Sequence, residues 1–216
     1  MRAKPTLRSP VMWSCCLPSA ATLRPILLAA ALACAFGEAL AQQARVRITF
    51  VAETPADSAA AEEYRRMWAG DESRVVAAME RFSGLRFVMP EWADTAITAR
   101  VLEAPANSGY RARPMRLRSS YPAATKLATL AHELGHRIQN DLFTRGEDDH
   151  EYLFLWLYDV WVALEGRAWA DQEVAVERRR GDRYVRAWDM ALALTPAQRA
   201  ERWRGIVAER RRGPNR

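Results

Sequence analysis

The sequence predicts an α+β fold, in which a small mixed sheet and one helix come first and a helical C-terminal half follows. Three observations support this prediction. Short segments that alternate apolar and polar residues, the pattern of a half-buried strand, lie before Ser119. After Tyr121 the apolar spacing becomes helical and stays so almost to the C-terminus. Half of the residues are apolar, with 10 Gly and 11 Pro, which is the composition of one globular domain with polar connections.

Residues 1–41 have the features of a secretory signal peptide. Several basic residues precede an apolar run over 26–36, and Ala39-Leu40-Ala41 forms a small-residue cleavage site. The run is about half of the roughly 20 residues that a membrane-spanning helix needs. We therefore expect export to the periplasm or the extracellular space, and a mature domain over 42–216 without a stable membrane span. Lipidation at Cys34 and an uncleaved signal anchor are weaker alternatives.

The expected mature domain contains no cysteine and has a modest net charge. All three cysteines, Cys15, Cys16 and Cys34, lie in the predicted leader, so the domain cannot form a disulfide. The formal charge of the chain is +6, and four basic residues and one acidic residue lie in the leader, which leaves +3. This charge argues against a general polyanion-binding role, so no nucleic-acid partner is expected.

The first part of the domain is predicted to alternate strands with one helix. Alternating apolar and basic residues predict a strand over 45–52, and Ala-rich helical spacing predicts a helix over 58–82, with Gly70-Asp71 as a candidate break. Further short strands are expected at 85–89, 97–102 and 113–118. The last of these alternates apolar side chains with arginines, which suits an edge strand with one solvated face.

The remainder is predicted to be helical. Helices are expected near 122–140, 150–164, 167–180, 183–194 and 196–211. The boundary between the sheet with its helix (42–140) and a helical subdomain (141–216) falls at the end of the first of them. An aromatic-rich segment over 152–169 is interpreted as core. The arginine run 178–180 alternates with glutamates at Glu173 and Glu177, which is typical of a solvated helical face.

One motif carries chemistry: His132-Glu133-Leu134-Gly135-His136, within the helix at 122–140. Residues four apart project from one helical face, so both imidazoles can bind one ion, and Glu133 is rotated from them by about 100°. A carboxylate beside a metal ion can take a proton from metal-bound water, whose pKa the ion lowers towards about 7. The motif thus predicts a zinc site with Glu133 as general base.

The histidines do not belong to the apolar stripe of their helix. That stripe consists of Leu127, Leu130, Ala131, Leu134 and Ile138, whereas Thr125, Thr129, His132 and His136 share the opposite side. We therefore expect the two imidazoles to face something other than the main core. Gly135 weakens a helix by up to about 1 kcal/mol relative to Ala, so it is expected to permit close approach of a strand or of substrate.

This pattern resembles the zincin superfamily of metallopeptidases. The resemblance covers roughly residues 45–165 and lies in the HELGH motif and in the order of elements, a strand, a helix, short strands and then the motif helix. It implies a zincin-like fold with one zinc ion and a peptide or protein substrate. By analogy it also implies that the strand at 113–118 pairs with an extended peptide.

The third ligand has three candidates after the motif. His150 and Glu165 lie on one side of the helix at 150–164, whereas Asp159 points about 180° from His150. His150 followed by Phe154 is similar to the HExxH…HxxxF arrangement of SprT-like zincins. A glutamate ligand is similar to thermolysin-like zincins, although their ExxxD pattern has Trp169 here in place of the aspartate. His150 is the favoured ligand, and Asp159 is also a candidate acceptor for a ligating imidazole.

The sequence therefore predicts an exported zinc metallopeptidase, with His132, His136 and His150 on the metal and Glu133 as the base. A noncatalytic zinc-containing module that binds a partner through the arginine-rich edge strand is the alternative. An anion- or membrane-surface protein with an accidental motif is a further alternative, which the modest charge disfavours. Three tyrosines are candidate donors to the oxyanion of a tetrahedral intermediate, Tyr110, Tyr121 and Tyr158.

Overall fold

Three strands form one parallel sheet in the computed structural model, which describes residues 46–87, 96–109, 113–143 and 149–213. They are β1 (Ile48–Ala52), β2 (Ile97–Leu102) and β3 (Met115–Arg118), in the order β1-β2-β3. The α+β class is confirmed. The expectation of a mixed sheet is wrong for these strands, because both pairings are parallel. An isolated antiparallel bridge joins Asn107 to Arg116.

The parallel pairing of β1 and β2 follows from the helix between them. Helix α2 (Ser58–Ser83) carries the chain back along the sheet, and parallel neighbours require such a crossover. The helix passes Gly70 without interruption, so the candidate break is absent. It ends at Gly84, whose φ of 64° lies in the left-handed region that glycine adopts readily.

The strand predicted at 85–89 is wrong over its described part. Residues 85–87 form no regular structure, and 88 and 89 lie outside the described residues. The backbone N–H of Leu85 donates to the Ser83 hydroxyl (3.1 Å), and that of Phe87 donates to the Glu80 carboxylate (3.0 Å). Side chains at the end of α2 thus satisfy these amides, and the buried Leu85 and Phe87 anchor an irregular segment.

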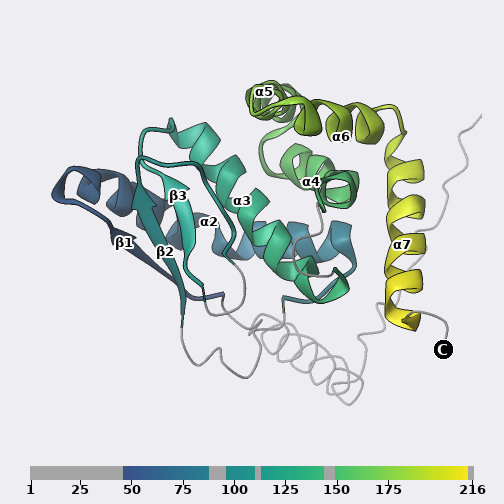
Figure 1. The fold of residues 1–216 in the computed structure, drawn as a ribbon, viewed down its shortest axis with the longest axis horizontal. Helices are drawn as coiled ribbons and strands as arrows, with labels where there is room; N and C mark the ends of the chain where they lie inside the picture. The colour runs from purple at the N-terminus through teal and green to yellow at the C-terminus, as the bar shows by residue number, and fades with distance from the viewer. Residues whose placement is uncertain (1–45, 88–95, 110–112, 144–148, 214–216) are drawn as a thin grey trace, which may run out of the picture. The chain divides into compact units, whose positions relative to one another are not determined.

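One face of the sheet is buried and the other is solvated. Ile97, Ala99 and Val101 of β2 point into the core, whereas the residues between them are exposed. Helix α2 packs against β1, and α3 (Ala123–Gln139) packs against β3 (Figure 1). The resulting two layers place the motif helix directly beside the last strand.

The helices after α3 complete the domain. They are η4 (Asn140–Leu142), α4 (His150–Glu165), α5 (Arg167–Arg178), α6 (Asp182–Leu192) and α7 (Pro196–Arg212). All five predicted helices from 122 onward are confirmed. Helix α4 contacts α2, α3, α5, α6 and α7, so it lies at the centre of the helical layer. The described residues all belong to one compact unit, Ala44–Arg216.

The aromatic residues of α4 form the core, as predicted. Phe154, Trp156 and Trp161 are fully buried, and Phe154 stacks on Trp188 of α6 with 3.9 Å between ring centroids. Trp203 of α7 donates its indole N–H to the carbonyl of Ser83 at 2.6 Å. These rings join the last two helices to α4 and to the end of α2.

The predicted leader lies outside the described residues, so the structure does not test its cleavage or export. None of the helices that the structure describes has both the length and the hydropathy needed to cross a bilayer.

Candidate metal centre

Three imidazoles converge at one point between α3 and α4. His132 and His136 lie one turn apart on α3, and His150 is the first residue of α4. One ring nitrogen from each lies within 4.8 Å of the other two. The Nε2 atoms of His132 and His136 are 3.0 Å apart. These are the three histidines of the whole sequence, and the structure brings all of them together.

A carboxylate contacts the other nitrogen of each α3 histidine. Asp149 lies 2.9 Å from Nδ1 of His136, and Glu177 of α5 lies 2.7 Å from Nδ1 of His132. The first contact is a well-formed hydrogen bond, whereas the second has the distance of an ion pair without hydrogen-bond alignment. Both groups of the second contact are buried, so their interaction is little screened by water. The pairing of a ligating imidazole with a carboxylate is typical of metal sites.

The donor set fits one zinc ion. A proton on each Nδ1, facing its carboxylate, leaves a lone pair on each Nε2, and two lone pairs at 3.0 Å repel unless a cation lies between them. Two nitrogens on a tetrahedral zinc ion, each about 2.0–2.1 Å from the metal, lie roughly 3.3 Å apart. The separation of the two Nε2 atoms on α3 is close to that value, and one ring nitrogen of His150 lies within 4.8 Å of the ligand atoms of both. His132, His136 and His150 could therefore hold a zinc ion and leave a fourth position for another ligand.

Asp149 couples the site to the start of α4. Its carboxylate accepts from the Gln139 amide at 2.7 Å as well as from His136, and its carbonyl accepts from the backbone N–H of Leu153 at 2.9 Å. Trp156 in turn donates to the Gln139 side chain at 3.2 Å. The residue before His150 thus fixes both the helix start and the orientation of one ligand.

The polar stripe of α3 faces a polar stripe of α5. Thr125 donates to Glu173 at 3.1 Å, and His132 meets Glu177, which also accepts from the Trp188 indole at 3.0 Å. Glu173 and Glu177 are 4% and 2% exposed. Their assignment to a solvated face is therefore wrong, because helix α5 turns this side towards α3 and away from water.

Glu133 is buried beside the imidazoles, at 3% exposure. Burial raises the pKa of its carboxyl to about 7, although His136 and Arg180 favour the ionised form. Burial also lowers the pKa of His132, with further contributions from the two neighbouring imidazoles. A neutral imidazole is the form that binds a metal ion. For Asp149, burial disfavours the charged form, but the hydrogen bond from His136 and that from Gln139 lower its pKa to about 2.

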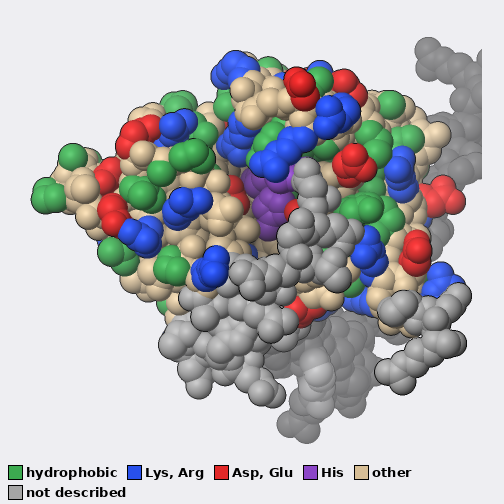
Figure 2. All heavy atoms as spheres, viewed as in Figure 1, with side chains coloured by type: hydrophobic (Ala, Val, Ile, Leu, Met, Phe, Trp, Pro, Cys, Tyr) green, Lys and Arg blue, Asp and Glu red, His purple; other side chains and the backbone are tan. Residues whose placement is uncertain are grey.

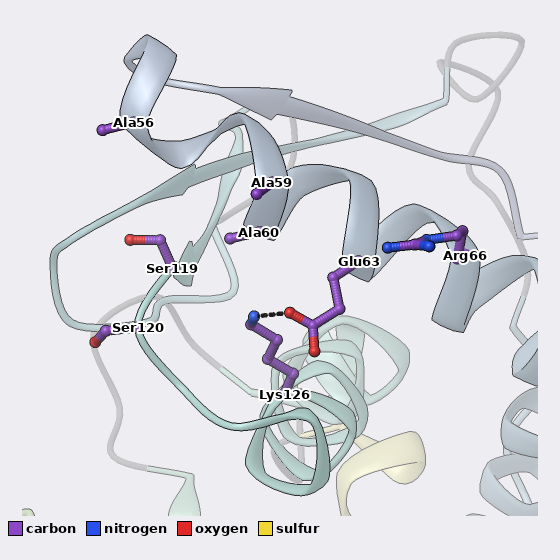
Figure 3. A pocket seen from close by; sticks show the side chains of 8 residues that line it. All are labelled: Ala56, Ala59, Ala60, Glu63, Arg66, Ser119, Ser120 and Lys126. Atoms are coloured by element: carbon purple, nitrogen blue, oxygen red, sulfur yellow. Dashed lines mark hydrogen bonds and ion pairs between the residues drawn. The ribbon is translucent and has the colours of Figure 1, made fainter.

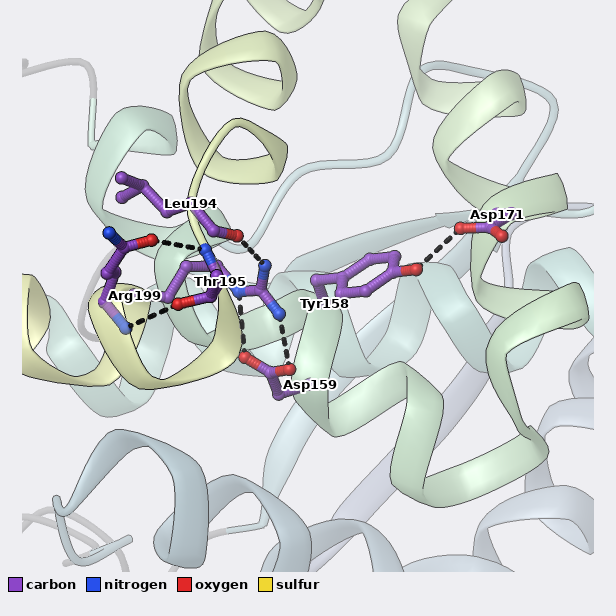
Figure 4. A network of polar contacts seen from close by, with 7 residues as sticks. Tyr158, Asp159, Asp171, Leu194, Thr195 and Arg199 are labelled. Atoms are coloured by element: carbon purple, nitrogen blue, oxygen red, sulfur yellow. Dashed lines mark hydrogen bonds and ion pairs between the residues drawn. The ribbon is translucent and has the colours of Figure 1, made fainter.

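Asp159 and Glu165 lie outside this cluster. Asp159 accepts two hydrogen bonds from the guanidinium of Arg199, at 2.7 and 3.0 Å (Figure 4). Glu165 pairs with Arg74 of α2 at 2.5 Å. Both were candidates for the third ligand, and Asp159 was also a candidate imidazole acceptor; their arginine partners instead make them links between helices.

The structure places the tyrosines differently from the sequence predictions. Tyr158 donates to Asp171 at 2.6 Å, on the side of α4 towards α5, and Tyr110 lies outside the described residues. Tyr121 lies next to Arg118, with 5.5 Å from the guanidinium to the ring. Tyr184, which no motif indicated, packs its ring against His150 with 4.6 Å between centroids. Only its contact across helices makes it part of the site.

The outer edge of β3 is partly occupied. The backbone N–H and carbonyl of Arg116 exchange hydrogen bonds with Asn107 at 2.8 and 3.0 Å, and the Arg118 carbonyl accepts from the Tyr64 hydroxyl at 3.1 Å. A peptide could add to the strand at Arg116 only if the segment with Asn107 moved away. Strand addition at this edge therefore has less support than the sequence alone suggested.

Comparisons with known proteins identify no relative of this chain. No protein-family model, curated protein or solved structure matches the chain. The zincin resemblance accordingly depends on the motif and the order of elements.

A separate hollow of about 520 Å³ lies between the start of α2, the turn after β3 and the start of α3 (Figure 3). Its charged residues are Glu63, Arg66 and Lys126, and small side chains complete the wall. Lys126 is buried and forms an ion pair with Glu63, 5.5 Å above the Tyr64 ring. This pair joins α2 to α3, and we assign it a structural role.

Proposed function

We propose that this chain is a zinc-dependent metallohydrolase, most specifically a peptidase. The observation that carries the proposal is the convergence of all three histidines on one point, with a buried glutamate next to the first of them. A structural zinc site is usually closed by four protein ligands, whereas three ligands leave a position for water or substrate. The predicted leader further suggests that the enzyme acts after export.

His132, His136 and His150 would hold the ion. Zinc bound there would lower the pKa of a coordinated water and polarise the substrate carbonyl. Asp149, hydrogen-bonded to Nδ1 of His136, would keep that imidazole in the tautomer that presents Nε2, and Glu177, 2.7 Å from Nδ1 of His132, would favour the same tautomer there.

Glu133 would serve as general base and then as general acid. Its carboxylate accepts the proton of the attacking water and returns it to the departing amine. Burial disfavours its charged form, so the carboxylate is a stronger base than an exposed glutamate would be. Because Glu133 follows His132 on the same helix, its side chain lies next to the imidazoles but points about 100° away from their shared side of the helix.

The noncatalytic alternative predicts a different use of these residues. A zinc-containing module that binds its partner by strand addition needs a free edge on β3, and the Arg116 backbone is already bonded to Asn107. It also has no need for a buried carboxylate at position 133. Both observations favour the hydrolase.

Glu133→Gln tests the proposal. The variant should bind one zinc per chain like the wild type, and it should hydrolyse a fluorogenic peptide library about 10²–10⁴-fold more slowly, because the proton acceptor is gone. Glu173→Gln is the matched control, since this buried glutamate contacts Thr125 and no histidine. Equal peptide hydrolysis by wild type and Glu133→Gln would refute the proposed function, as would wild-type protein that binds no zinc.

A further inference from the structure

Tyr184 forms part of the wall beside the three imidazoles. Its ring centroid lies 4.6 Å from that of His150 and 6.3 Å from that of His132, and the residue is 8% exposed. It belongs to the first turn of α6, a helix that supplies no metal ligand. The start of α6 is therefore a neighbour of the proposed reaction centre.

Two arginines flank this tyrosine. The guanidinium of Arg180 lies 5.6 Å from the centre of the Tyr184 ring, and that of Arg183 lies 5.2 Å from it. The Arg180 side chain is 20% exposed, and Arg183 is exposed. Figure 2 shows the histidine surface on one face of the molecule, with Lys or Arg side chains directly next to it. Positive charge thus borders the imidazole surface where solvent reaches it.

The ion pair of Arg180 with Glu177 is long, and Glu177 shares the same oxygen with His132. The Arg180 Nη1 lies 3.5 Å from the nearer oxygen of Glu177, and the same oxygen lies 2.7 Å from His132. The guanidinium also acts electrostatically on Glu133. Arg180 therefore lies close enough to act on the proposed base, it also interacts with the Tyr184 side chain, and its own side chain is partly open to solvent.

We propose that Arg180 and Arg183 form an anion subsite that holds a carboxylate of the substrate beside the metal centre. Guanidinium groups are permanently charged and bind carboxylates through paired hydrogen bonds, and both groups lie within 5.6 Å of the centre of the Tyr184 ring. The inference rests on the proposed function and narrows it, because the substrates are then peptides with an acidic side chain or a free C-terminus at this position.

Binding of glutarate tests the subsite without any hydrolysis. The zinc-loaded full-length protein should bind glutarate in preference to its uncharged diamide, as measured by isothermal titration calorimetry. Arg180→Met and Arg183→Met should each weaken glutarate binding by about tenfold or more, with zinc content unchanged. Arg186→Met, an exposed arginine farther along α6, is the matched control and should bind glutarate like the wild type.

Additional variants distinguish loss of the anion subsite from misfolding and from anion binding by the metal ion alone. Arg183 is exposed, so its replacement should leave the melting temperature unchanged, and Arg180→Lys keeps a positive charge and should retain part of the binding. Glutarate binding that depends on zinc but is equal in wild type, Arg180→Met and Arg183→Met would overturn the proposal, because the metal alone would then hold the anion. Equal binding of glutarate and its diamide would overturn it as well.

Matched peptides identify the source of the carboxylate. Four peptides are compared, with an internal Glu or Gln and with a free or an amidated C-terminus. If the subsite binds an acidic side chain, the Gln peptides should have a higher KM than the Glu peptides; if it binds a free C-terminus, the amidated peptides should have the higher KM. The difference should disappear in Arg183→Met. If the wild type hydrolyses all four peptides with equal KM, the subsite is wrong and the hydrolase proposal stands. If it binds glutarate through the arginines but hydrolyses no peptide, the subsite stands and the hydrolase proposal is wrong.

Discussion

Each proposed ligand on α3 contacts a carboxylate from another part of the chain. His136 is oriented by Asp149, just before α4, and His132 by Glu177 near the end of α5. Asp149 is itself held by Gln139, and Glu177 by Trp188. The orientation of the two imidazoles therefore depends on residues just before α4, in α5 and in α6, as well as on Gln139 of α3 itself. Replacement of Asp149 or Glu177 should therefore change the metal affinity, although neither residue is a proposed ligand.

We predict that Asp149→Asn and Glu177→Gln each lower zinc affinity by about 10–100-fold, because a neutral amide holds the imidazole less firmly and makes its free nitrogen a weaker donor. Competition with a chromophoric chelator measures this change. Glu173→Gln, on the same stripe of α5 but in contact with Thr125, should leave the affinity unchanged. Wild-type affinity in Glu177→Gln would show that its contact with His132 has no orienting role.

At the scale of elements, α3 is positioned by close packing against α4. A Cβ atom on Gly135 would lie 2.6 Å from Leu153 Cδ1 and 3.2 Å from Trp156 Cη2. Leu153 and Trp156 are buried, and a close-packed interior leaves such side chains little room to move. The glycine thus permits the approach of a helix, where the sequence suggested a strand or substrate.

We predict that Gly135→Ala lowers the free energy of unfolding by about 1–3 kcal/mol, since overpacking outweighs the gain in helix propensity. Gly70→Ala in α2 is the control: no atom lies within 4 Å of its added Cβ, so stability should rise by up to about 1 kcal/mol. Urea unfolding of both variants measures the difference. A stabilised Gly135→Ala protein would contradict this packing account.

Helix α7 is held by a polar network that includes Asp159, which the sequence had offered as a candidate metal ligand. Arg199 bonds Asp159 twice and also donates to the Leu194 carbonyl at 2.7 Å, while Thr195 caps the helix by accepting from the Gln198 N–H (Figure 4). The Arg199 side chain is 4% exposed and that of Asp159 16%. The pair therefore links α4 to α7 in a largely dry environment.

Arg199→Met should lower the free energy of unfolding by about 3 kcal/mol, because it leaves the Asp159 carboxylate largely buried without its partner. Adding Asp159→Leu should restore part of the loss, and the double variant should still bind one zinc per chain. Chemical denaturation and metal analysis on the same preparations measure both effects. Loss of zinc from the folded double variant would return Asp159 to the candidate ligands.

For the whole molecule, the proposed metal centre joins parts that are distant in sequence. The ligands come from α3 and the start of α4, and the carboxylates come from positions 149 and 177. An unfolded chain cannot hold these groups together, so zinc should bind the folded state preferentially. Metal binding and folding are then coupled.

We predict that a free zinc concentration about 1,000 times the dissociation constant stabilises the protein by roughly 4 kcal/mol, which a chelator removes. Differential scanning calorimetry with and without zinc measures this gain, and magnesium at the same concentration should have little effect. His150→Ala should abolish most of the zinc-dependent shift. An identical melting temperature in zinc and in chelator would exclude a site at these histidines.

The sequence by itself determined the local features of this protein. The pairing of His132 with His136 follows from four-residue spacing on a helix, and the later helices and three strands follow from their periodicity, since each depends on neighbours in the chain. The strand expected at 85–89 failed because side chains of α2 satisfied its amides.

Only the tertiary structure decided which distant residues meet the motif. It brought His150 to the cluster while arginines took Asp159 and Glu165, and it turned Glu177 towards His132. The sequence favoured His150 among the three candidates, but it contains no signal for the arginine partners of Asp159 and Glu165 or for the contact of Glu177 with His132, because the relative rotation and spacing of α3, α4 and α5 result from packing of the whole core.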